Sequence, residues 1–180
     1  MNNKIKLALS TIIGGCLASG YAHSASTNTI NFQGEVSAET CSVTVNGNTA
    51  TPTVLMPTAS TADLAASGDT AGQTTFTMGL TGCTGNATAA TTASTVFVGN
   101  QVTSTGNLGN TGTAKNVEIQ LLDTKSAVID LTSNYTASGD LTLAIGNTSS
   151  SADYIAQYYA TGKSTAGTVL ASLQYAVTYL

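Results

Sequence analysis

The side chains that could carry chemistry in this 180-residue chain are one histidine, three cysteines and nine carboxylates. A hydrolytic triad needs a basic group, and the single histidine, His23, stands at the edge of an N-terminal leader. Paired carboxylates could act as acid and base instead. The first four acids lie in polar, turn-like stretches, where solvation and turn capping are their ordinary roles: Glu35, Glu39, Asp63 and Asp69. The pattern predicts that the chain is not an enzyme.

Ligand-binding patterns are equally weak. The stretch "GNLGNTG" has regularly spaced glycines, but it lies in no strand–loop–helix unit, so it is interpreted as a hairpin loop rather than a phosphate-binding loop. There is no Cys-x-x-Cys motif, and one histidine cannot complete a zinc site, so we expect no metal and no cofactor. Four tyrosines could form a sugar-binding stripe, but their parity favours the core or an interface: Tyr154, Tyr158, Tyr175 and Tyr179.

The N-terminus has the three-part layout of a secretory signal peptide. Two lysines precede an apolar run from Leu7 to about Leu17, and small residues follow it. The run is too short to span a bilayer as a stable helix. We predict a signal peptide over residues 1–22 with cleavage after Ala22, or alternatively two or three residues later. A second interpretation stays open, because "IIGGC" is compatible with a lipoprotein signal that lipidates Cys16.

Charge and composition limit the partners of the exported part. Three lysines against nine carboxylates leave a formal charge of −6, with no arginine, which argues against nucleic acid and anionic membranes as partners. Charged residues make up only 8% of the chain, so Thr, Ser, Asn, Gly and Ala must cover the surface. Such a neutral surface suits a protein that stays outside the cell or packs against its own copies.

Two cysteines remain after the leader, Cys41 and Cys83. An exported protein with two cysteines most simply forms one disulfide. The bond would close a loop of about forty residues, which is worth roughly 4 kcal/mol in the chain-entropy model.

Apolar residues of the exported part recur with a period of two, which is typical of strands with one buried face. Turn clusters rich in Gly, Asn, Ser and Thr separate these segments, and no segment keeps helical periodicity over three turns. About nine or ten short strands in one domain predict an all-β sandwich or barrel. The expected strands are 29–36, 41–45, 52–57, 74–83, 94–99, 116–123, 127–131, 141–146, 153–162 and 168–180.

Several of these features occur in a characteristic order. "INFQGEVSAETCSV" is a glycine-containing strand that leads to Cys41, nine residues after Phe32. "FTMGLTGC" carries the second cysteine, "NVEIQLLD" and "YIAQYYATG" follow as a middle and a late strand, and a tyrosine stands in the penultimate position. From about Thr27 to Leu180 the chain therefore resembles the fimbrial subunits of the chaperone–usher pathway, in particular the major pilins of type 1 fimbriae.

The resemblance implies an incomplete immunoglobulin-like sandwich that lacks its final strand and is completed by a donor strand from another subunit. Residues 23–36 would be the donor arm, with Ile30 and Phe32 filling the groove and Gly34 allowing close backbone approach or marking the end of the arm. Residues 37–180 would be the pilin domain. Because arm and groove are different surfaces, identical or related subunits would join head to tail into a filament.

The last strand would line the acceptor groove in the same family scheme. Its residues of one parity are Leu173, Tyr175, Val177 and Tyr179, and the carboxylate of Leu180 would dock on basic residues of a periplasmic chaperone. At the outer-membrane usher, the arm of the next subunit would replace the chaperone strand. Cys41 and Cys83 match the family disulfide.

The predicted function is therefore a structural subunit of an adhesive filament, exported through the periplasm to a bacterial surface, with any host receptor met by a separate tip adhesin. A minor pilin or adaptor remains open, whereas an adhesin is disfavoured because about 155 exported residues hold only one sandwich. The alternative from another class is a monomeric secreted or lipid-anchored β-sandwich that binds a ligand. Cleavage after Ala25 would shorten the arm and weaken the joint, which favours cleavage after Ala22.

Overall fold

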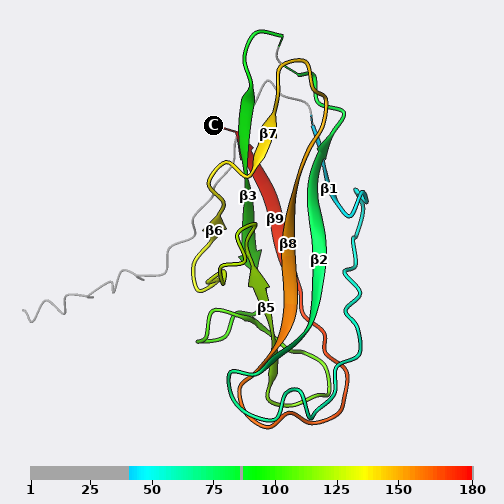
Figure 1. Cartoon of the computed structure of the whole chain (residues 1–180), viewed down its shortest axis with the longest axis vertical. Helices are drawn as coiled ribbons and strands as arrows, with labels where there is room; N and C mark the ends of the chain where they lie inside the picture. The colour runs from blue at the N-terminus through cyan, green and yellow to red at the C-terminus, as the bar shows by residue number, and fades with distance from the viewer. Residues whose placement is uncertain (1–40, 86, 180) are drawn as a thin grey trace, which may run out of the picture. The chain divides into compact units, whose positions relative to one another are not determined.

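The computed structural model describes residues 41–85 and 87–179, which form nine β-strands (Figure 1). These residues contain no helix, and so none that could cross a membrane. The all-β prediction is confirmed. The strands are β1 (Ser42–Val45), β2 (Thr70–Thr81), β3 (Thr91–Gly99), β4 (Leu108–Gly109), β5 (Val117–Leu122), β6 (Tyr135–Thr136), β7 (Leu141–Leu143), β8 (Ser150–Ala160) and β9 (Leu173–Tyr179).

The strands pair antiparallel in two sheets. The five-stranded sheet has the order β1-β2-β8-β5-β4, and in the second sheet β3 is flanked by β6 and β7 on one edge. Strand β9 pairs with β3 from Leu173↔Gly99 to Tyr179↔Ala93. Because β9 shares the partners Phe97 and Ala93 with β6 and β7, it must lie on the opposite edge of β3. No other strand in the described part of the chain pairs with β9.

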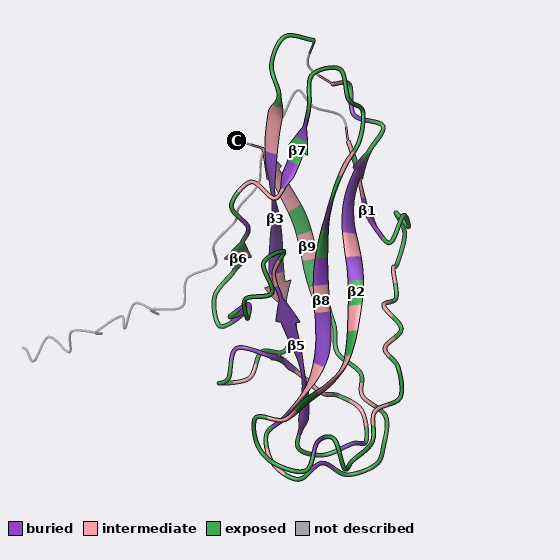
Figure 2. Cartoon of the chain, in the orientation of Figure 1, coloured by how far each residue is buried: buried purple, intermediate pink, exposed green. Residues whose placement is uncertain are grey.

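An aromatic cluster joins the two sheets at the centre of the core. Phe97 of β3 meets Tyr154 of β8 edge-on, with ring centroids 5.0 Å apart. Phe76 of β2 stacks on Tyr154 at 5.8 Å. Phe97 and Tyr154 are fully buried. Figure 2 shows buried stretches along β3 and β8 in purple. Rings of this size supply much of the apolar burial in a sandwich core.

The polar end of Tyr154 reaches a carboxylate that also contacts the other sheet. The Tyr154 hydroxyl donates to Asp140 Oδ2 at 2.8 Å. The backbone N–H and the hydroxyl of Thr95 donate to the same carboxylate at 2.8 and 2.6 Å. Asp140 therefore ties β3 of one sheet to β8 of the other, and it satisfies groups that would otherwise be buried without partners.

Replacing Tyr154 with phenylalanine is expected to change how stability depends on pH. Burial, and then the bond to Asp140, raise the pKa of Tyr154 well above the ordinary tyrosine value of 10.0. The folded chain thus keeps a neutral hydroxyl while the unfolded chain ionises above pH 10, so this group lowers stability as the pH rises beyond 10. Tyr154→Phe should lower stability at pH 7 by about 1–3 kcal/mol through the lost bond. Between pH 9.5 and 11.5 the urea midpoint of the variant should then fall less steeply than that of the parent chain. Equal slopes for the two chains would contradict a raised pKa of Tyr154 in the folded state.

The polar side chains of β5, Glu118 and Gln120, are buried in the fold because they find hydrogen-bond partners on neighbouring elements. Gln157 Nε2 of β8 donates to Gln120 Oε1 at 2.8 Å, and Gln73 Nε2 of β2 donates to Gln157 Oε1 at 2.8 Å. Glu118 accepts bonds from Thr105 and Asn107. All six residues of β5 are therefore buried.

The strand predicted at 127–131 is wrong. Asp123 Oδ1 accepts bonds from the backbone N–H groups of Lys125 and Ala127, which turns the chain back directly after β5. What remains is a single bridge, Leu122↔Val128. The strand expected at 141–146 also ends early, at Leu143, and the two-residue strands β4 and β6 lie in stretches that looked like turns.

Candidate acceptor groove

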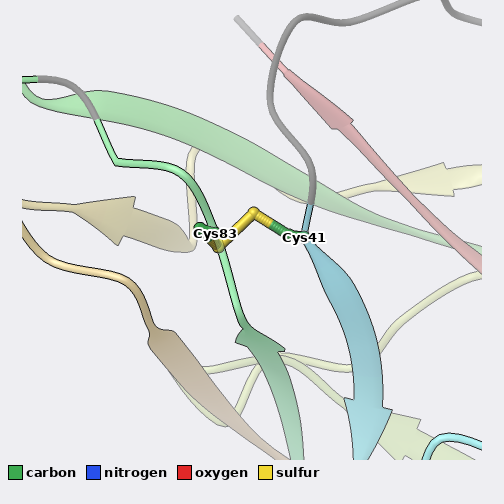
Figure 3. Close-up of a disulfide and its surroundings, with 2 residues drawn as sticks. All are labelled: Cys41 and Cys83. Carbon is green, nitrogen blue, oxygen red and sulfur yellow. A yellow bond between two sulfur atoms is a disulfide. The ribbon is translucent and has the colours of Figure 1, made fainter.

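A disulfide joins Cys41 and Cys83, whose Cα atoms are 4.2 Å apart (Figure 3). Cys41 directly precedes β1, and Cys83 follows the end of β2 by two residues. The bond therefore fastens the beginning of the described chain to the ladder between β1 and β2.

Pairing between β1 and β2 ends at a tight turn. Asn46 and Gly47 have φ angles of 50° and 77°, the left-handed values that a two-residue hairpin turn requires. Val45 and Asn48 exchange both backbone hydrogen bonds across this turn, at 2.9 and 3.0 Å. The chain is thereby released from β2 and continues as a separate segment.

Residues 51–57, called the free rim here, form one side of the site and run along the edge of the domain without a strand arrow (Figure 1). Val54 and Met56 are half-buried against the core, whereas Leu55 between them is 83% exposed. The prediction of a strand at 52–57 is wrong, although Val54 and Met56 do face the core. The free rim has no strand partner among residues 41–85 and 87–179.

The opposite side of the site consists of β9 and the segment that leads into it. A neighbouring loop holds this segment: Thr111 N donates to Leu170 O at 2.8 Å, and Leu170 N donates to Asn110 Oδ1 at 2.9 Å. One edge of β9 is bonded to β3, and its other edge has no described strand beside it.

An apolar cavity of about 460 Å³ lies between the free rim and β9. Both sheets contribute to its floor: Phe76 of β2 and Ala156 of β8 come from the five-stranded sheet, and Phe97 of β3 comes from the second sheet. Val54 and Met56 line it from the rim, and Val169 and Leu170 line it from the segment before β9. We call this cavity, with its two walls, the groove.

A second cavity of about 410 Å³ adjoins the groove. The two share Met56, Tyr158 and Val169, so these three residues lie where the cavities meet. Ser164 lines the second cavity, and its buried hydroxyl has no hydrogen-bond partner within the described part of the chain.

The residues predicted for this site fall into three groups. Leu173 and Tyr175 line the groove, whereas Val177 and Tyr179 pack against the core beyond it. Ile30, Phe32, Gly34 and Leu180 lie outside the described residues. Sequence reasoning missed the second wall and the floor, although the short apolar run between Pro52 and Pro57 did suit a sheet edge. No group of metal-ligating side chains occurs in the ranges that the structure describes.

Comparison with known proteins identifies the class. Residues 30–180 match the family model described as "Fimbrial protein", and the chain belongs to this family. It is 40% identical to an F17 fimbrial protein of Escherichia coli over 83% of this chain and 86% of the relative. It is 35% identical to the major fimbrial subunit SMF-1 of Stenotrophomonas maltophilia strain K279a, over 90% of this chain and 98% of the relative.

The fold agrees with this family. A solved chaperone–usher pilus structure matches with a TM-score of 0.56 and 15% identity, covering 86% of this chain and 96% of the solved one. The two-sheet domain is therefore the immunoglobulin-like sandwich of pilin subunits. The chain is a structural fimbrial subunit rather than an enzyme. Related pilin subunits are its partners, and the cell-surface fimbrium is its location.

Proposed function

We propose that the chain polymerises by donor-strand exchange, in which the arm of one subunit, residues 23–36, occupies the groove of the next. The observation that carries this proposal is the groove itself: an apolar cavity between the free rim and β9, neither of which pairs with a described strand across the cavity. A strand can add to a sheet edge at such a place through main-chain hydrogen bonds. A strand placed there would pair with β9 and cover the core.

The sequence of the arm suits this groove. Ile30 and Phe32 have the same parity, so in an extended arm both side chains would face one side. The groove walls and floor are apolar at Val54, Met56 and Leu173. Burial of two large apolar side chains there would favour the joint by about 1.5–3 kcal/mol each.

The same scheme assigns the remaining partners. An exported subunit with an open groove is an aggregation hazard, so a periplasmic chaperone would fill the groove first, with the carboxylate of Leu180 docked in its cleft. The outer-membrane usher would then exchange that strand for the next arm. Residues 1–22 would direct export, and a separate tip adhesin would contact any host receptor.

Replacing both Ile30 and Phe32 with alanine should abolish assembly while leaving the domain intact. The variant should still be recovered in complex with its chaperone, because its own groove is unchanged. On unheated detergent gels it should lack the ladder of multimers. The matched control is Asn31→Ala with Gln33→Ala, which alters the other face of the same arm and should leave the ladder in place.

The two outcomes separate the competing ideas. A normal ladder from the Ile30/Phe32 variant would show that these side chains do not fill the groove. Loss of the ladder in the Asn31/Gln33 control as well would show that the other face of the arm also makes contacts needed for assembly.

A further inference from the structure

Tyr158 occupies a special position in the groove. It lies on β8, lines both cavities, and is only partly buried. Together with Met56 and Val169, it lies where the groove and the second cavity meet. No other tyrosine of the described chain lines both cavities.

The ring can take this position because β2 has a glycine beneath it. At Gly72, where φ is +64°, an added Cβ would come within 2.7 and 2.8 Å of two Tyr158 ring carbons. The register between β2 and β8 shifts at this point, between Ala71 and Thr74. A bulge with a glycine therefore leaves room for an aromatic ring to lie flat on the sheet.

The hydroxyl of Tyr158 reaches across to the free rim. It donates a hydrogen bond to the carbonyl oxygen of Pro57 at 3.1 Å. Within the described part of the chain this is the only hydrogen bond made by residues 51–59. Apart from it, the rim is held by the contacts of Val54 and Met56 with the core.

We propose that Tyr158 is a positioning residue for donor-strand uptake, whose hydroxyl holds the free rim at the spacing that an inserted strand needs. The inference rests on the donor-strand function proposed above. An apolar groove without a strand favours collapse, because closing it buries Val54 and Met56 more fully. The bond to Pro57 opposes this movement at one end of the rim. A groove held open before binding requires less reorganisation when the arm arrives.

The test uses the full-length exported chain with Ile30→Asp and Phe32→Asp, which prevents self-assembly, and a fluorescent peptide with the sequence of residues 27–40. In this background Tyr158→Phe should bind the peptide about five-fold more weakly, mainly through slower association, as expected for the loss of one hydrogen bond. Tyr159→Phe is the matched control: it is the same change one residue later, on the other face of β8. It should bind like the parent chain.

A second measurement separates positioning from general stability. The urea unfolding midpoint of the peptide-free chain should be the same in Tyr158→Phe and Tyr159→Phe. Equal peptide affinities in the two variants would overturn the inference and leave the donor-strand function standing. A midpoint that falls enough to explain the weaker binding would also overturn it. Failure of the parent chain to bind the peptide would overturn both proposals.

Discussion

Replacing Ala156 with phenylalanine is expected to produce a subunit that can donate its arm but cannot accept one. Ala156 is 5% exposed and lines the floor of the groove between its two walls. A ring at this position would extend into the 460 Å³ cavity, where the donor-strand proposal places Ile30 and Phe32 of the next subunit. Because the cavity already borders this side chain, the domain should tolerate the larger residue with about 1–3 kcal/mol of strain.

The decisive measurement is complementation between two defective subunits. Ala156→Phe alone should form no ladder, and neither should Ile30→Ala with Phe32→Ala. Mixed together, they should form a dimer, because one retains its arm and the other retains its groove. Ala156→Leu provides a milder version of the same block and should shorten the ladder.

Two results would contradict this prediction. A full ladder from Ala156→Phe would mean that the arm binds elsewhere. Two variants that both fold as purified exported chains without chaperone, yet form no mixed dimer, would show that Ala156 and the arm do not belong to the same joint.

Deleting Tyr175–Leu180 should prevent the chain from reaching a stable fold. The deletion removes five of the seven β9 residues paired with β3, from Tyr175↔Phe97 to Tyr179↔Ala93. It would expose Phe97, which has no accessible surface in the intact fold, and would remove Tyr175 from one wall of the groove. We expect proteolysis in the periplasm and no complex with the chaperone.

A control for this deletion changes β9 without shortening it. Gln174→Ala with Ala176→Ser alters two exposed positions of the opposite parity, so pairing with β3 and contacts with the core remain. This variant should accumulate normally and form ladders. Recovery of the truncated chain as a soluble complex would show that β9 is dispensable, which would remove the basis for the groove.

The strand pattern was predictable wherever one face meets the core and the other meets water. β9 illustrates this: Leu173, Tyr175 and Val177 are half-buried, and Gln174 and Ala176 are exposed. The prediction failed where a local side-chain bond decided the path. Asp123 turns the chain after β5 and removes the expected strand at 127–131, and period-two alternation carries no information about such a bond.

The groove was predictable from one side only. The penultimate tyrosine and the regular last strand indicated one wall, while the glycine-containing arm indicated what would fill it. The free rim was visible as an apolar run between Pro52 and Pro57. The sequence did not show that the free rim faces β9. About 115 residues separate the two walls, and their approach depends on how the sheets pack.

The sequence by itself determined the class of this protein. The predicted signal peptide, the lack of a histidine suited to a hydrolytic triad, the alternating strands and the spacing of the two cysteines are all local features, and the physical preferences behind them act over a few neighbours. Only the tertiary structure decided where the open edges lie. The Asn46–Gly47 turn releases the rim from β2, Gly72 leaves room for the Tyr158 ring, and the floor draws side chains from both sheets. Each of these depends on contacts between segments far apart in the chain, which burial of the core brings together.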